Sequence, residues 1–432
     1  MFSLKGTDVL EPKVVSMAIF IAAYVLFVFL TNRRTLVAVC AAALVVLFGA
    51  ISPKEAFLAI NWNVMGIFVG TLVVADVFME SRVPAYLAEV IVDKAKSTAW
   101  AILFLCAMTG FISAFVENVA TVLIVAPIAL SLAQKLKINP IKMMIAIAIS
   151  SNLQGTATLI GDPPSMLLGG FAKMNFGDFF FYHGRPSIFF AVQLGAITSF
   201  FILYYVFRDH RQKTQLVMVE KVRSWAPTVI LVGLIFLLAA SSFFDPGFSY
   251  IAGSLCMIAG VISMLWEKLA NERPVLQGLK SLDWQTTFFL MGIFILVGSI
   301  TVTGWIETIS EFLSGLIGEN IFFGYTLIVF ISVFVSAFVD NVPFLAAMLP
   351  VAVSMSERLQ INPSLLLFGL LIGASLGGNV TPIGASANIV ACGLLKKEGY
   401  PMKFMDFVKI GLPFTLVAVI PAYLFIWLIW RN

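Results

Sequence analysis

Apolar segments alternate with short polar stretches along the whole chain of 432 residues. A helix needs about 20 consecutive apolar residues to cross the hydrocarbon core of a bilayer, and most of these segments have about that length. The pattern predicts membrane-spanning helices over residues 14–30, 35–50, 62–80, 187–207, 226–243, 248–266, 284–303 and 411–430.

Two longer apolar tracts do not divide into single spans, because acids, amides, glycines and prolines interrupt them. These tracts cover residues 97–173 and 320–395. They contain nearly the same short stretch, SAFVENV at 113–119 and SAFVDNV at 336–342. We therefore predict that the chain consists of two copies of one structural unit.

The repeat extends well beyond this short motif. Residues 113–161 align with 336–384 without a gap, and 19 of the 49 aligned positions are identical. Further upstream, NWNVMGIFVG at 61–70 matches DWQTTFFLMG at 283–292. Internal repeats of this kind are typical of secondary transporters, whose two halves often have opposite orientations in the membrane.

Each half is expected to contain scaffold spans, a re-entrant helical hairpin and a broken helix. The first inverted repeat covers 1–207, a cytoplasmic connection covers 208–225, and the second repeat covers 226–432. An odd number of full crossings per half, about five, inverts the second half and gives about ten spans plus two hairpins. The three parts are expected at 14–80, 97–134 and 141–173 in the first repeat, and at 226–303, 320–356 and 364–395 in the second.

Composition supports a chain embedded in lipid. Hydrophobic residues make up 60% of the chain and charged residues 12%, whereas soluble domains average about 25% charged residues. The net charge is +4, and many of the basic residues lie in short loops, such as Arg33 and Arg34. The positive-inside rule assigns these loops to the cytoplasm. We predict an all-α polytopic protein of a bacterial-type plasma (inner) membrane, surrounded by lipid and without a nucleic-acid partner.

The motifs do not predict an enzyme, a metal centre or a bound cofactor. The four cysteines are scattered and lack metal-ligand or redox spacing. An intramembrane aspartyl protease would need a Gly-x-Gly-Asp pattern, and Leu159 stands where LIGDPP would need the first glycine. A channel would need a continuous polar pathway through the membrane. Sites that hairpins close from both sides fit alternating access better than they fit a channel. The small partner that we expect is a transported or coupling ion, either a proton or sodium.

The acids in the two repeated motifs are candidate coupling residues. Glu117 and Asp340 fall at the predicted turns of the hairpins. An ionised side chain at mid-bilayer costs about 2.5–3.5 kcal/mol even on the mildest scale, so such acids usually have a function. Each could exchange a proton or bind a cation. Asp162 is a third candidate, but Ala385 stands at its position in the second copy, so its role would be asymmetric.

Glycines and prolines are expected to interrupt one helix in each half. An interrupted helix exposes backbone carbonyls and half-helix ends that can bind an ion or a polar solute within a protein cavity. The helix-breaking residues are Gly155, Gly161, Pro163 and Pro164 in the first copy and Gly377, Gly378, Pro382 and Gly384 in the second.

Polar side chains near these breaks are candidate ligands for an ion or substrate. Such amides and hydroxyls also commonly join neighbouring membrane helices without touching a ligand, and this alternative stays open for each of them. The candidates are Asn118, Asn152, Thr156 and Thr158 in the first copy and Asn341, Asn379, Thr381, Ser386 and Asn388 in the second.

At these residues the sequence resembles the ion transporter superfamily, in its arsenite permease, sodium–proton antiporter and P-protein branch. The stretches that carry the resemblance are SAFVENVATVLIVAPIAL, GTATLIGDPPSMLL, SAFVDNVPFLAAMLPV and LGGNVTPIGASANIV. The resemblance implies two hairpins, two unwound helices and a homodimer whose transport domains move like elevators against a fixed scaffold.

One departure from the superfamily bears on the cargo. Dicarboxylate carriers of the superfamily have Ser-Asn-Thr at both hairpin tips, where this chain has Glu117-Asn118-Val119 and Asp340-Asn341-Val342. The acids favour proton coupling or a cation site. Our first hypothesis is therefore a proton-coupled antiporter that exports a small inorganic solute or metalloid such as arsenite. A sodium–proton antiporter and a sodium-coupled carrier of an organic anion are the alternatives.

Overall fold

The computed structural model describes residues 11–30, 33–212, 220–318 and 320–432. The start of the expected first repeat (1–10) and part of the expected connection (213–219) lie outside the described residues. The described part forms twenty α-helices, two short 3-10 helices and one small β-hairpin, made of β1 (Phe181–Tyr182) and β2 (Arg185–Pro186). The predicted all-α class is confirmed.

The helices occur in the same order in both halves. Those of the first half are α1 (Pro12–Phe29), α2 (Arg34–Leu47), α3 (Pro53–Ala59), α4 (Trp62–Glu80), α5 (Val83–Lys94), α6 (Thr98–Ser113), α7 (Asn118–Leu136), α8 (Ile141–Gly155), α9 (Pro163–Ala172) and α10 (Ile188–Phe207). Those of the second half are α11 (Ala226–Ser241), α12 (Ile251–Asn271), α13 (Val275–Ser281), α14 (Trp284–Val302), α15 (Trp305–Ile317), α16 (Ile321–Ser336), α17 (Asn341–Arg358), α18 (Pro363–Gly377), α19 (Ser386–Lys397) and α20 (Phe404–Trp430).

Eight of the described helices are long and apolar enough to cross a membrane. Six of them, α1, α4, α10, α12, α14 and α20, correspond to predicted spans. The other two, α7 and α18, belong to the tracts that the sequence did not divide into single spans. The predicted spans 35–50 and 226–243 form the shorter apolar helices α2, of 14 residues, and α11, of 16 residues.

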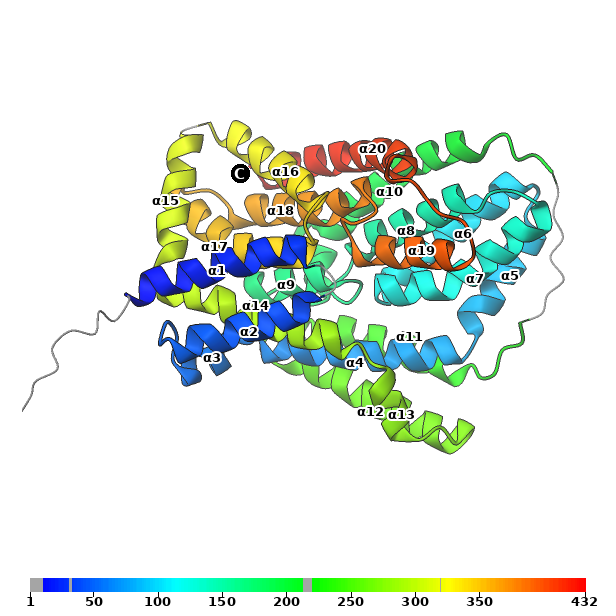
Figure 1. The fold of residues 1–432 in the computed structure, drawn as a ribbon, viewed down its shortest axis with the longest axis horizontal. Coiled ribbons are helices and arrows are strands. Elements are labelled where there is room, and N and C mark those ends of the chain that lie inside the picture. Colours follow the sequence, from blue (N-terminus) through cyan, green and yellow to red (C-terminus); the bar gives the residue numbers. More distant parts are fainter. Residues whose placement is uncertain (1–10, 31–32, 213–219, 319) are drawn as a thin grey trace, which may run out of the picture.

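The loops between the predicted spans contain helices that the sequence analysis missed. α3, α5 and α13 fall between predicted elements, and α15 occupies the stretch 305–317 that follows the predicted span 284–303. α3 and α13 have only seven residues each, too short for their apolar periodicity to be read. α5 and α15 each contain acidic residues, which masked their helical pattern in a search for apolar spans. In Figure 1, α5 and α15 lie at opposite ends of the molecule.

The packing divides the helices into two groups. α1 to α4 pack with α11 to α14, chiefly through the pairs α4–α12 and α2–α14, and we call this group the scaffold. α6 to α10 pack with α16 to α20, chiefly through α6–α8, α16–α18 and α10–α20, and we call this group the hairpin bundle. Figure 1 shows α4 and α12 on one side of the molecule and α10 and α20 on the other.

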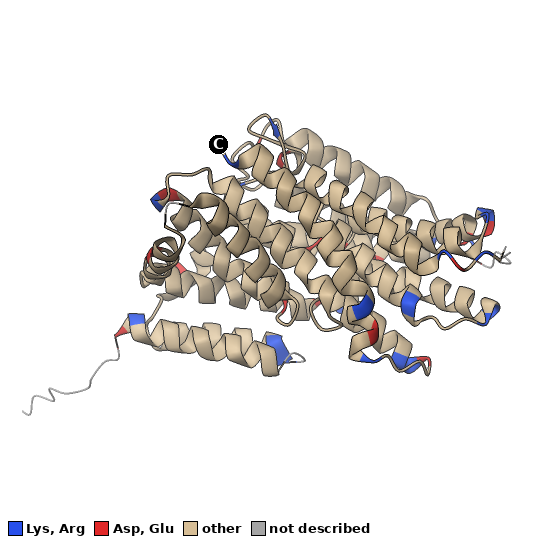
Figure 2. Cartoon of the chain, turned by 90° about the horizontal axis from the view of Figure 1, so that it is seen from above, with Lys and Arg blue, Asp and Glu red and all other residues tan. Residues whose placement is uncertain are grey.

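The two helical hairpins enter the bundle from opposite ends. α7 runs from the middle of the molecule toward the end where α5 lies, and α17 runs from the middle toward the end where α15 lies (Figure 1). Charged residues occur at both ends of the long helices, and others lie nearer the middle of the molecule, as Figure 2 shows. The predicted inversion of the two halves is therefore present in the fold, and the hairpin tips meet between the charged ends.

Candidate functional site

Each hairpin tip carries an acid that caps the following helix. Oε2 of Glu117 accepts a hydrogen bond from the backbone N–H of Ala120 at 3.0 Å, just before α7. Oδ1 of Asp340 accepts from the backbone N–H of Val342 at 3.0 Å, just before α17. The start of a helix carries partial positive charge, so it stabilises these two half-buried carboxylates.

The predicted helix breaks occur in both halves. α8 ends at Gly155 and α9 begins at Pro163, while α18 ends at Gly377 and α19 begins at Ser386. A short 3-10 helix, η3 (Gly378–Val380), follows α18. Proline lacks a backbone N–H, so Pro163 is tolerated at the start of α9 but could not continue a helix from α8.

Two glycines let the unwound segments cross the helix ends closely. A Cβ on Gly161 would lie 2.2 Å from the Gly155 carbonyl oxygen. A Cβ on Gly384 would lie 2.6 Å from the Gly378 carbonyl oxygen. Both distances are too short for any side chain, so this close crossing requires glycine in both halves.

In each half, one threonine joins the unwound segment to the hairpin turn of that half. The hydroxyl of Thr158 donates to the Ala114 carbonyl, and the hydroxyl of Thr381 donates to the Ala337 carbonyl. All four residues are buried. These bonds fix the hairpin tip against the break in the neighbouring helix, which agrees with the structural alternative kept open for Thr158 and Thr381.

Four buried asparagines form a hydrogen-bond network between the two halves. Nδ2 of Asn152 donates to Oδ1 of Asn379 at 2.9 Å and to Oδ1 of Asn388 at 2.8 Å. Nδ2 of Asn118 donates to Oδ1 of Asn152 at 3.0 Å. Nδ2 of Asn379 has no hydrogen-bond partner among the residues that the structure describes. The network connects the first hairpin and both broken helices.

A small cavity of about 50 Å³ lies between the two hairpin tips. It is formed where six helices begin, namely α2, α7, α9, α14, α17 and α19. The polar residues that line it are Arg34, Glu117, Asn118, Asp283, Thr286, Asn341 and Ser386. Predicted residues from both repeats therefore meet at one place, together with Pro163 and Pro164.

Arg34 and Asp283 are cavity residues that the sequence analysis did not select. Arg34 was assigned to a cytoplasmic loop, but α2 has only 14 residues and begins beside the hairpin tips. At about 1.5 Å per residue such a helix is much shorter than a bilayer core. Asp283 is exposed and caps α14 by accepting from Thr286 N–H at 2.9 Å. The internal repeat could have drawn attention to Asp283, because a polar residue, Asn61, occupies the matching position in the first half.

The Arg34 guanidinium contacts several groups at the cavity. It forms an ion pair with the Asp340 carboxylate. It also donates from Nη2 to the Ser386 hydroxyl at 3.2 Å and lies 5.1 Å from the centre of the Phe289 ring. The second hairpin acid is therefore paired with a cation, while among the described residues the Glu117 carboxylate accepts hydrogen bonds from backbone N–H groups alone.

Asp162 lies apart from the cavity lining. Its side chain is buried, and Oδ1 accepts from Ser165 N–H at 2.9 Å at the start of α9. The Thr156 hydroxyl lies 3.4 Å from Oδ2 of the same carboxylate. The geometry is that of a helix N-cap, and Ala385 at the matching position of the second repeat leaves α19 without a side-chain cap.

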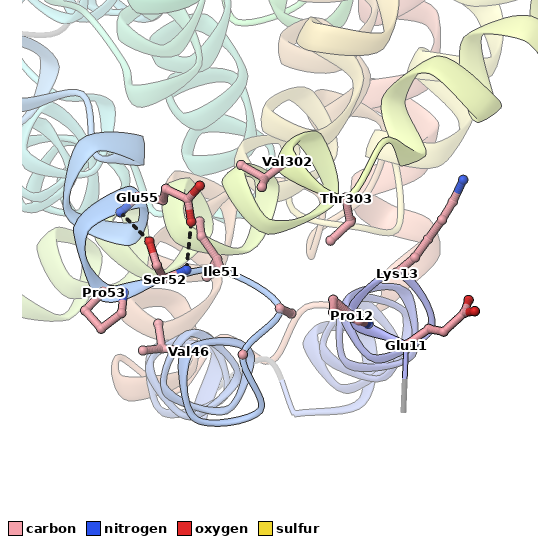
Figure 3. A pocket seen from close by; sticks show the side chains of 12 residues that line it. Glu11, Pro12, Lys13, Val46, Ile51, Ser52, Pro53, Glu55, Val302 and Thr303 are labelled. Atoms are coloured by element: carbon pink, nitrogen blue, oxygen red, sulfur yellow. Dashed lines mark hydrogen bonds between the residues drawn. The ribbon is translucent and has the colours of Figure 1, made fainter. Parts of the chain in front are cut away.

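A larger cleft of about 630 Å³ lies at one end of the scaffold, between the start of α1, the end of α2 and the end of α14 (Figure 3). Glu55 and Ser52 on its wall cap each other's backbone at 2.9 and 3.2 Å. Hydrogen bonds from Ser52 hold the pKa of Glu55 below its ordinary value. The residues that line this cleft include none from the hairpins or broken helices, so it is not the candidate site.

Two inverted halves, each with a hairpin and a broken helix around a central polar cavity, define a secondary transporter. A family model described as a citrate transporter, CitMHS, matches residues 24–357 and 326–432, and the chain belongs to this family. It is therefore an integral membrane transporter and not an enzyme.

Individual relatives agree with this assignment. An uncharacterized transporter of Mycobacterium tuberculosis is 30% identical over 426 residues, which cover 96% of this chain and 98% of the relative. The P protein of Mus musculus is 25% identical over 500 residues, which cover 96% of this chain and 60% of that protein. The predicted resemblance to the P protein is thus confirmed.

The fold also matches a solved transporter. The crystal structure of the YdaH transporter of Alcanivorax borkumensis aligns with a TM-score of 0.60 at 12% identity. The alignment covers 97% of this chain and 98% of the YdaH chain. At this identity the match supports the fold alone.

Proposed function

We propose that this transporter is a proton-coupled antiporter that works by alternating access and exports a small inorganic solute. The observation that carries the proposal is a group of three acids at one small cavity: Glu117 and Asp283 line it, and Asp340 is paired with Arg34, which also lines it. A carboxylate in such a site can take a proton from one side of the membrane and release it on the other.

The size of the cavity favours a small cargo. A cavity of about 50 Å³ holds only a few water-sized particles, since one water needs about 10–15 Å³ of such space. A proton, a monovalent cation or a small metalloid hydroxide fits this volume. A larger organic anion would require the hairpin tips to separate first.

Sodium is the second candidate cargo, which would make the protein a sodium–proton antiporter. Carboxylate, amide and hydroxyl oxygens suit hard cations, and the lining supplies all three from Glu117, Asn118, Asn341 and Ser386. Arsenite rests on the family resemblance alone. A sodium-coupled organic anion stays the third candidate, because the six helix starts and Arg34 would attract carboxylate groups.

The proposal includes an assembly and a motion. We expect a homodimer in a bacterial plasma membrane, in which the scaffold stays fixed and the hairpin bundle moves like an elevator. The separate packing of scaffold and bundle supports this motion, and exposed aromatic side chains on the scaffold, such as Phe236 at 71% exposure, offer apolar surface for lipid or a second copy.

The proposal can be tested in proteoliposomes that contain a pH-sensitive dye. Sodium, lithium, arsenite and citrate are added outside in turn, and the internal pH is recorded. A pH change on adding arsenite alone supports export of an inorganic solute. A change on adding sodium or lithium identifies a cation antiporter, and a response to citrate only would contradict the inorganic cargo.

A further inference from the structure

One ion pair connects the scaffold directly to a hairpin tip. Arg34 is the first residue of α2, which packs on α1 and α14 of the scaffold. Asp340 caps α17, which packs on α18 and α9 of the hairpin bundle. Any movement of the bundle along the scaffold must therefore break the contact between Arg34 and Asp340.

The surroundings of the pair restrict water. The side chain of Arg34 is 21% exposed and that of Asp340 is 15% exposed. The Ser386 hydroxyl and the Phe289 ring hold the guanidinium from two further helices, α19 and α14. Separating two poorly hydrated opposite charges is costly unless another cation replaces the one that is lost.

The pair occurs in one half only. α12 is the counterpart of α2, and the sequence from 242 to 255, which includes its beginning, contains no Lys or Arg. Glu117 at the first hairpin tip accordingly has no ion pair within the part of the chain that the structure describes. Glu117 and Asp340 are thus unequal, although they occupy matching positions in the repeat.

We propose that Arg34 is a coupling residue that holds the hairpin bundle in place until cargo or a proton neutralises Asp340. While Asp340 is charged and empty, the ion pair keeps the bundle in the conformation described. When Asp340 takes a proton on its carboxylate, or binds a cation, Arg34 loses its partner and the bundle is free to move. This inference rests on the proposed function, and it adds that Arg34 prevents movement of the unloaded transporter.

A cysteine cross-link can report the position of the bundle. Asn61 of the scaffold lies beside Gly170 of α9, and its Nδ2 is 3.4 Å from the Gly170 carbonyl oxygen. A Cβ on Gly170 would lie 3.5 Å from Cγ of Asn61 but only 2.6 Å from Cγ2 of Val64. Asn61→Cys and Gly170→Cys are therefore combined with Val64→Ala, which removes this clash and leaves two thiols within bonding reach. The four native cysteines are replaced by alanine, and the full chain is cross-linked in liposomes without cargo.

The account predicts that Arg34→Gln lowers the cross-linking rate several-fold, whereas Arg34→Lys stays close to the parent. Asp340→Asn should lower the cross-linking rate as much as Arg34→Gln does. The double variant should have the same rate as either single variant. The matched control is Arg273→Gln, which breaks the ion pair of 2.8 Å between Arg273 and Asp76. This pair is about as exposed as the Arg34–Asp340 pair, but both of its residues belong to the scaffold.

Three results would overturn the proposal. They are an unchanged rate in Arg34→Gln, additive effects in the double variant, or an equal loss in Arg273→Gln. The proposed function is judged separately, by cargo-driven pH change in the parent protein. A parent that cross-links as expected but moves no protons would remove the antiport proposal and leave the role of Arg34 in holding the bundle.

Discussion

The side chains of Asn152 and Asn379 come from different halves of the chain and share a hydrogen bond of 2.9 Å. Asn152 lies at the end of α8, and Asn379 lies in the 3-10 turn after α18. Both are almost fully buried. This bond joins the two broken helices at the centre of the molecule, so one polar network connects both of them with the first hairpin.

Replacing Asn152 should therefore loosen both halves together. Asn152→Ala removes two donated bonds and one accepted bond. Hydrogen bonds between membrane helices contribute about 0.6 kcal/mol on average, so we expect a loss of about 1–2 kcal/mol. A lower thermal midpoint in detergent would show this. Gln212→Ala, an exposed amide, is the control, and equal midpoints in both variants would contradict the structural role of the network.

The close crossing of the unwound segments predicts intolerance to any side chain there. Gly161→Ala and Gly384→Ala would each force a methyl group against a carbonyl oxygen, and overpacking of this kind costs about 1–3 kcal/mol or more. We expect aggregated or poorly expressed protein on size-exclusion chromatography. Gly315→Ala in α15 meets nothing within 4 Å and should elute like the parent. Normal elution of the first two variants would show that the crossing is looser than described.

Asp162 can be assigned to capping or to coupling by two substitutions. Asparagine retains an oxygen that accepts the Ser165 N–H but carries no charge, whereas alanine removes the cap. If Asp162 acts as a cap, Asp162→Asn transports like the parent and Asp162→Ala loses about 1 kcal/mol of stability. Loss of proton-coupled transport in a well-folded Asp162→Asn protein would instead make it a coupling residue.

Much of the architecture could be predicted from the sequence because both halves of the chain repeat the same structural unit. The repeat around Glu117 and Asp340 located both hairpin turns, and the glycines and prolines located both breaks. These features depend on local backbone chemistry, which sequence patterns report directly.

The contributions of the scaffold to the cavity could not be predicted in the same way. Arg34 lies 306 residues from Asp340 in the sequence, and its side chain reaches the cavity because α2 is short and begins beside the hairpin tips. Asp283 reaches the same cavity through the packing of α14 on the hairpin bundle. Sequence periodicity contains no information about such contacts between distant elements.

The most direct test of the central claim is cargo-driven proton movement in Glu117→Gln and Asp340→Asn proteoliposomes. Each variant removes one hairpin-tip carboxylate and keeps an oxygen for the helix cap, so both should reconstitute as folded protein. Glu55→Gln, an acid at the distant scaffold cleft, serves as the matched control. The account predicts that coupled pH changes disappear in both hairpin variants and persist in the control. Full coupled activity in both hairpin variants would show that neither acid is needed and would contradict it.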